Sequence, residues 1–283
     1  MFLLRKILDS WLESATLAAV TEQQDVIARF DAGGTLDAIR WAFASACART
    51  LADYVPAAGY NTTLLGSMQH HLFRDRLDRV FATGAYSISL DAGDDAGLDV
   101  VRDQLTPRDI GTMPKFASGQ VVRDNLNGSP GWSYRGNRFL LQSAPIDKIE
   151  TLPWSQKRPT KQRVAKQPDP EPDLGLLAAL PGAQDLRDAL EALRAHHGSL
   201  DMPTFVVAHA LDGETGRRQL MIGRPQFTAG DAGTWRWLEN LLTTPPPRST
   251  RASDPVMPSG PDVVPDAPVR LRSDRETRKA DEQ

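Results

Sequence analysis

The stretch from Trp132 to Asp173 decides the expected architecture, because three kinds of sequence follow one another within it. WSYRGNRFLLQSAPIDKIETLPWSQ (132–156) is typical of paired strands around a glycine-containing turn. KRPTKQRVAK (157–166) is a run of positive charge without an acid, and QPDPEPD (167–173) is rich in proline. We therefore expect a folded module to end at a basic and Pro-rich linker over residues 157–173.

The residues before this stretch favour helices first and strands later. Apolar residues recur at three- and four-residue spacings up to about residue 82, as in Leu4, Ile7, Leu8 and Trp11, which predicts packed helices. Asn61, Thr62 and Thr63 stand at the start of one of these helices, and each is a suitable N-cap. The β-rich character that follows predicts a helical and then β-containing module over residues 1–156.

The residues after the linker predict a smaller unit over residues 174–242. AQDLRDALEALRAHHG (183–198) has one apolar face and ends in glycine, as a helix does. TFVVAHAL (204–211) and RQLMIGR (218–224) flank DGETG, whose glycines suit a tight hairpin turn. TWRWLENLL (234–242) is interpreted as a closing helix, so the expected order is α-β-β-α.

The remaining residues, 243–283, contain many Pro, Ser, Asp and Arg and no aromatic residue. Such a composition cannot bury enough apolar surface to offset chain entropy, so a disordered tail is expected. The fold class is therefore α+β: a helical N-terminal part with a small sheet, a second small α-β-β-α unit and a disordered C-terminal tail.

Composition indicates an ordinary globular protein. Of the 283 residues 40% are hydrophobic and 24% charged, and the net charge of −3 produces no global field that would attract nucleic acid or anionic membrane. The single Cys47 cannot form an internal disulfide, which favours a reducing compartment and predicts a cytoplasmic protein. Arg5, Lys6 and Asp9 interrupt the first apolar run, so no membrane association is expected.

One predicted helix carries the candidate catalytic residues His71, Asp75 and Asp78. Residues three and four apart project from one side of a helix, so the imidazole and the two carboxylates share a face. An imidazole beside carboxylates can act as a general base in a hydrolase or nuclease. The alternative is a solvated face with local ion pairs. The adjacent His70 points about a third of a turn away, so the two histidines do not form a zinc motif.

Other polar groups favour structural roles. His196 and His197 stand before a glycine at a helix C-terminus, where histidine interacts favourably with the helix dipole. His209 lies within an apolar strand and is expected in the core or on the sheet face. The acidic loop from Asp91 to Asp99 lacks the ligand spacing of a calcium loop, so no metal and no cofactor are predicted.

The basic segment is the candidate nucleic-acid interface. Cations neutralise phosphates and exposed aromatic rings stack on bases, and the residues concerned are the cations Lys157, Arg158, Lys161, Arg163 and Lys166, with Trp132, Tyr134 and Trp154 nearby in the sequence. The alternative is a solvated linker whose charge is neutralised by the acids of the proline-rich segment.

No phosphate-binding loop, dinucleotide-binding motif, nucleophile elbow or H-E-x-x-H motif is present. We therefore expect a non-enzymatic cytoplasmic interaction or regulatory protein whose partner is another protein, with the oligomeric state left open. A nucleic-acid-binding protein using residues 157–166 is the first alternative. A hydrolase or nuclease using the helix face of His71 and Asp75 is the second.

Overall fold

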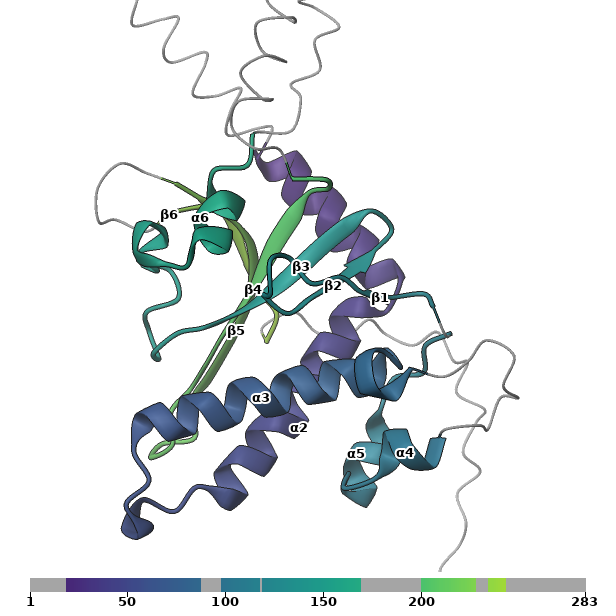
Figure 1. Cartoon of the computed structure of the whole chain (residues 1–283), viewed down its shortest axis with the longest axis vertical. Coiled ribbons are helices and arrows are strands. Elements are labelled where there is room, and N and C mark those ends of the chain that lie inside the picture. The colour runs from purple at the N-terminus through teal and green to yellow at the C-terminus, as the bar shows by residue number, and fades with distance from the viewer. Residues whose placement is uncertain (1–18, 88–97, 118, 169–199, 228–233, 243–283) are drawn as a thin grey trace, which may run out of the picture. The chain divides into compact units, whose positions relative to one another are not determined.

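A mixed sheet of six strands organises the structure (Figure 1). The computed structural model describes residues 19–87, 98–117, 119–168, 200–227 and 234–242. The strands lie side by side in chain order: β1 (Val122–Arg123), β2 (Gly131–Tyr134), β3 (Asn137–Ser143), β4 (Thr204–Leu211), β5 (Arg218–Gln226) and β6 (Thr234–Asn240). Neighbours are antiparallel except β3 and β4, which are parallel. The predicted α+β class is confirmed.

The longer helices precede the sheet in the sequence, as the apolar periodicity predicts. They are a helical segment over residues 19–32, α2 (Thr35–Asp53) and α3 (Thr62–Val80). Asn61 is the N-cap of α3, because its side-chain oxygen accepts a hydrogen bond of 2.9 Å from the Leu64 amide. The shorter elements are η1 (Pro56–Ala58), η2 (Gly84–Tyr86), α4 (Leu98–Arg102), α5 (Pro107–Thr112), η3 (Trp154–Gln156) and α6 (Pro159–Ala165).

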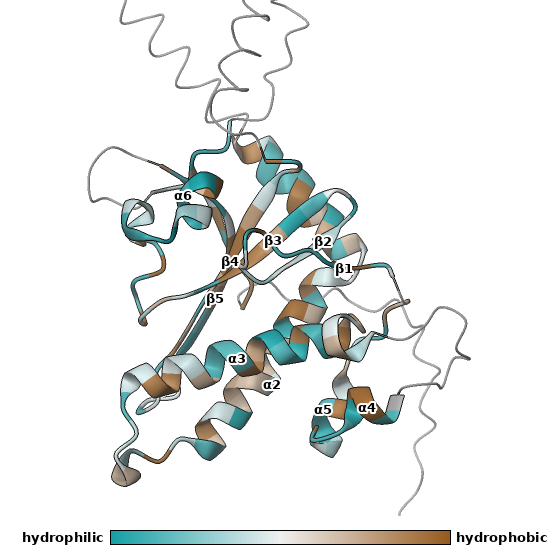
Figure 2. Cartoon of the chain, viewed as in Figure 1, coloured by the Kyte–Doolittle hydropathy of each residue, from teal (hydrophilic) through white to brown (hydrophobic). Residues whose placement is uncertain are grey.

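The sheet separates two hydrophobic cores, because successive side chains of a strand point to opposite faces. Phe139 and Phe205 belong to the core that α2 and α3 share with the sheet. Leu140 and Val206 point the other way, into a second core with α6 and Trp154. Figure 2 shows the apolar residues concentrated along β4, which is buried on both faces.

The prediction of a helix over residues 234–242 is wrong, because residues 234–240 form the edge strand β6. A bulge opposite Arg224 and Pro225 adds one residue to β6. The extra residue places Trp235 and Leu238 against the same core, while Trp237 enters the other core. Trp235 and Leu238 are three residues apart, and this spacing is also typical of a helix, which explains the error.

The prediction of a linker over residues 157–173 is also corrected where the structure describes it. Residues 159–165 form α6, and Val164 and Ala165 are buried in the second core. β3 precedes this segment and β4 follows it, yet the two strands pair directly. The sheet therefore continues across the expected boundary between the modules. Residues 174–199 of the expected unit and the whole of the expected tail, 243–283, lie outside the described residues.

Candidate ligand-binding site

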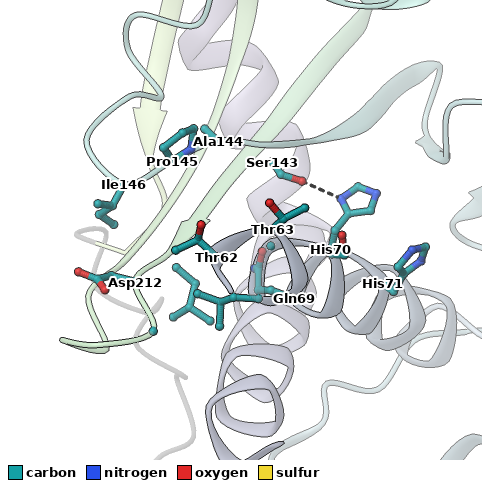
Figure 3. Close-up of a pocket in the computed structure, with 15 residues that line it drawn as sticks. Thr62, Thr63, Gln69, His70, His71, Ser143, Ala144, Pro145, Ile146 and Asp212 are labelled. Carbon is teal, nitrogen blue, oxygen red and sulfur yellow. Dashed lines mark hydrogen bonds between the residues drawn. The ribbon is translucent and has the colours of Figure 1, made fainter. Parts of the chain in front are cut away.

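A cavity of about 700 Å³ opens beside the first half of α3 (Figure 3). Three segments line this α3 pocket: α3 between Thr62 and His71, residues 143–146 at the end of β3, and the turn 211–213 between β4 and β5. Its size is within the range of small-molecule sites, which run from about 300 to 1,000 Å³.

The turn 211–213 is held against the helices by close packing. A β-carbon added at Gly213 would lie 2.7 Å from the Tyr54 ring and 3.0 Å from the Leu65 side chain, so only glycine fits there. The carboxylate of Asp212 accepts hydrogen bonds from the Thr215 hydroxyl at 2.7 Å and from the Glu214 amide at 2.9 Å. This wall of the pocket is therefore fixed by local contacts.

Two lining residues of the pocket, His70 and Ser143, contact each other, and His70 also contacts His209, which lies behind the lining in the core. Nδ1 of His70 lies 3.2 Å from the Ser143 hydroxyl and 3.2 Å from Nε2 of His209. Figure 3 shows Ser143 and His70 turned toward each other. Ser143 and His209 are register partners in the parallel pair of β3 and β4, which puts their side chains on one side of the sheet under α3. The prediction that His209 is a core residue is confirmed, because it is fully buried.

Both imidazoles are held neutral at neutral pH. Burial, with the nearby charges of His71, Lys161 and Arg74, lowers the pKa of His70 to about 4. Burial also lowers the pKa of His209 well below its ordinary value, and the neighbouring His70 and Lys161 act in the same direction. The pair therefore supplies hydrogen-bonding groups without a charge.

Gly66 lines the pocket from within α3, although a helix interior disfavours glycine. It lies in a helix interior without a positive φ, and a β-carbon built on it would meet nothing within 4 Å. Glycine at such a position costs about 0.5–1 kcal/mol relative to alanine. Any larger side chain at residue 66 would extend into the pocket that the residue lines.

Lys161 is buried, and its charge is close enough to affect the pKa of both histidines. The backbone groups of alternate residues in a strand point to opposite edges of that strand. β2 covers one edge of β3, but the pairing of β2 with β3 ends at Leu140. The carbonyl of Leu141 thus faces the open edge, where it accepts a hydrogen bond of 2.6 Å from Lys161 Nζ. Gln142 covers the Ser143 carbonyl in the same way at 2.7 Å. These side chains protect an exposed sheet edge.

The predicted catalytic residues do not converge. His71 lies exposed on the pocket lining, whereas Asp75 and Asp78 face away from it toward other partners. Asp75 accepts hydrogen bonds from Arg76, from Arg79 at 2.8 Å and from the Tyr86 hydroxyl at 2.5 Å. Among the described residues, no hydrogen bond joins either carboxylate to His71.

Asp78 is enclosed by donors from three segments. Its carboxylate accepts hydrogen bonds from Arg123, from the Trp132 indole at 3.0 Å and from the Thr83 hydroxyl at 3.1 Å. Burial raises its pKa, although these donors act in the opposite direction. Burial also raises the pKa of Asp75, but Tyr86 and the neighbouring arginines outweigh it and hold that pKa below its ordinary value.

The five basic residues of 157–166 do not share one surface. Lys161 points into the protein, and Lys166 lies over the Phe227 ring at 4.4 Å. The aromatic residues that could stack on bases, Trp132, Tyr134 and Trp154, are all buried. The candidates that remain for a nucleic-acid interface are Lys157, Arg158, Arg163 and Lys166. Residues 159–165 of this segment are helical rather than extended.

Other expectations have mixed outcomes. Cys47 is buried, and burial raises the pKa of its thiol to about 12. His196, His197 and the acidic loop up to residue 97 lie outside the described residues. Of the residues that the structure describes, no three His, Cys, Asp or Glu side chains gather in a way that could hold a metal ion. None of the described helices has the length and hydropathy needed to cross a bilayer.

Gly66, His70 and Ser143 were not predicted as a group. One signal was available for Gly66, since an isolated glycine inside a helical pattern calls for a packing or functional reason. Ser143 and His70 carry no local signal, because 73 positions separate them in the sequence. No protein-family model, curated protein or solved structure matches the chain.

Proposed function

We propose that the protein is a regulatory binding protein that holds a small molecule in the α3 pocket and catalyses no reaction there. The observation that carries this proposal is Gly66. The helix loses stability by having glycine at this position, and neither backbone conformation nor close packing requires it. Gly66 also lines the pocket, so a helix that gives up stability at this position fits a site that trades stability for function.

The arrangement of the histidines supports binding rather than hydrolysis. In a catalytic triad, the nucleophile and the orienting residue contact opposite nitrogens of the histidine. Here Ser143 and His209 both approach Nδ1 of His70. Because one nitrogen cannot serve as an unshared base for Ser143 while it also contacts His209, the geometry favours a recognition role for the serine hydroxyl.

The proposal is tested with a fragment library that contains neutral, anionic and cationic compounds. Heteronuclear NMR of the full chain would follow the amide resonances of the pocket residues during titration. Gly66→Leu places an apolar side chain at a residue that lines the pocket, where an added β-carbon meets nothing within 4 Å. Gly111→Leu is the matched control, since Gly111 is an exposed residue of α5 with open space around it.

The expected result is a set of fragments that shift the resonances of Ser143 and its neighbours in the wild type. Gly66→Leu is expected to abolish these shifts, whereas Gly111→Leu leaves them unchanged. A library without a single compound that shifts the pocket resonances contradicts the proposal. So does binding that Gly66→Leu leaves intact.

A further inference from the structure

The lining of the α3 pocket contains little formal charge. Among the lining residues that the structure describes, Asp212 alone has a fixed charge, and none is a lysine or an arginine. The carboxylate of Asp212 is occupied by the turn that it stabilises. The chain from Tyr54 to Met68, which includes the first part of the α3 lining, has no charged residue. An anionic ligand would therefore lose its hydration without gaining an ion pair.

The walls of the pocket are apolar on the side opposite α3. Ala144, Pro145 and Ile146 follow β3, and Leu211 ends β4. Leu65 adds an apolar side chain from the helix itself. These walls suit an apolar ligand body, because the hydrophobic effect stabilises burial of such a body by about 25 cal/mol for each Å² removed from water.

The tautomers of His70 and His209 determine which polar group beside Ser143 is free. Nδ1 of His209 is buried and has no hydrogen-bond partner among the described residues. Buried N–H groups without partners are rarer than buried acceptors without partners, which places the His209 proton on Nε2. Nε2 then donates to Nδ1 of His70. The lone pair nearest to Ser143 is thus already engaged, and the serine hydroxyl can rotate to donate elsewhere.

We infer that the ligand is an uncharged molecule with an apolar body and a carbonyl oxygen that accepts a hydrogen bond from the Ser143 hydroxyl. This inference rests on the proposed function and names the class of ligand for the same pocket. The carbonyl lies beside Ser143 and His70, and the apolar body contacts Leu65, Ile146 and Leu211.

Four probes of one shape test the inference by NMR titration of the full chain. They are cyclohexanone, methylenecyclohexane, cyclohexanecarboxylate and cyclohexylammonium. We expect cyclohexanone to bind the wild type best. Ser143→Ala is expected to lower the affinity for cyclohexanone by about 2- to 10-fold, which corresponds to the loss of one hydrogen bond. The same change is expected to leave the affinity for methylenecyclohexane, which has no oxygen, unchanged.

The inference is overturned if the carboxylate or the ammonium compound binds as tightly as the ketone. It is also overturned if Ser143→Ala lowers the affinities for cyclohexanone and methylenecyclohexane equally. A third contrary outcome is that none of the four probes binds while other library fragments shift the pocket resonances. In each of these cases the proposed function still stands if Gly66→Leu abolishes the binding of some fragment. Failure of the ligand class can therefore be distinguished from failure of the proposed function.

Discussion

The indole Nε1 of Trp132 donates a hydrogen bond of 3.0 Å to the carboxylate of Asp78. This bond joins β2 to the last turns of α3, across 54 positions of the sequence. Trp132 is fully buried and stacks on Phe139 with ring centroids 5.5 Å apart. Arg123 contacts both partners, through an ion pair with the carboxylate and through its position 4.3 Å above the indole ring. Asp78 therefore anchors the helix to the sheet.

Asp78→Asn is expected to destabilise the protein by about 2–4 kcal/mol, because Arg123 would be left half-buried without its counter-charge. Denaturant unfolding followed by tryptophan fluorescence measures the change. Asp53→Asn is the control, since the ion pair of Asp53 with Arg49 is exposed and is expected to contribute less than about 1 kcal/mol. Equal effects of the two substitutions would contradict the anchoring role.

Gly66→Ala is expected to stabilise the protein by about 0.5–1 kcal/mol, because alanine loses less backbone entropy in a helix and the site has room for its methyl group. Thermal unfolding measures the shift in Tm. Gly213→Ala is expected to act in the opposite direction, since its methyl group would overlap the Tyr54 ring. A loss of stability in Gly66→Ala would mean that the fold itself requires this glycine.

The histidine pair is expected to make the protein sensitive to acid. The folded pKa of His70, about 4, lies below its ordinary value of 6.5, so the unfolded chain binds more protons between these values. The free energy of unfolding therefore falls as the pH drops from 6.5 toward 4, by up to about 1.4 kcal/mol for each pH unit. His70→Gln is expected to reduce this slope in denaturant unfolding at pH 6.5, 5.5 and 4.5.

His71→Gln serves as the control for this experiment, because His71 is exposed and occupies the next position of the same helix. His71→Gln is expected to keep most of the slope, because burial, the largest cause of the lowered pKa of His70, is unchanged and only the smaller contribution of the His71 charge is removed. Parallel profiles for the wild type and His70→Gln would show that His70 does not contribute to acid sensitivity.

Lys161 is expected to produce the complementary effect at alkaline pH. Burial, assisted by the nearby Lys157, lowers its pKa from 10.5 to about 7. The unfolded chain again binds more protons between these values, so stability rises with pH from about 7 upward, by up to about 1.4 kcal/mol for each pH unit. Lys161→Met removes this rise, whereas Lys166→Met, at an exposed position, is expected to retain it. A slope that persists in Lys161→Met would contradict the assignment.

Local patterns predicted much of the secondary structure, because short-range periodicity and capping control it. These patterns predicted the helices of the N-terminal part, an N-cap within residues 61–63 and the hairpin of β4 and β5. The errors arose where tertiary structure alters the pattern. The bulge in β6 imitates helical spacing, and α6 carries its charges on a segment whose Val164 and Ala165 are nevertheless buried.

The candidate site was less accessible to prediction. His71, Asp75 and Asp78 share a helix, and a sequence pattern can place residues on one helix face. It cannot show that Asp78 accepts a hydrogen bond from Trp132, or that Lys161 points inward and donates a hydrogen bond to the Leu141 carbonyl. Partners that are distant in the sequence therefore decided the role of each of these groups.

By itself, the sequence determined the α+β class, the near-neutral charge and the uncharged run from Tyr54 to Met68, because composition and short-range pattern do not depend on how the chain closes. Only the tertiary structure decided that Ser143, His70 and His209 meet. The parallel pairing of β3 with β4 sets Ser143 beside His209, and the packing of α3 across these strands brings His70 within 3.2 Å of both. Such long-range contacts follow from burial of the shared core, which no local pattern of residues records.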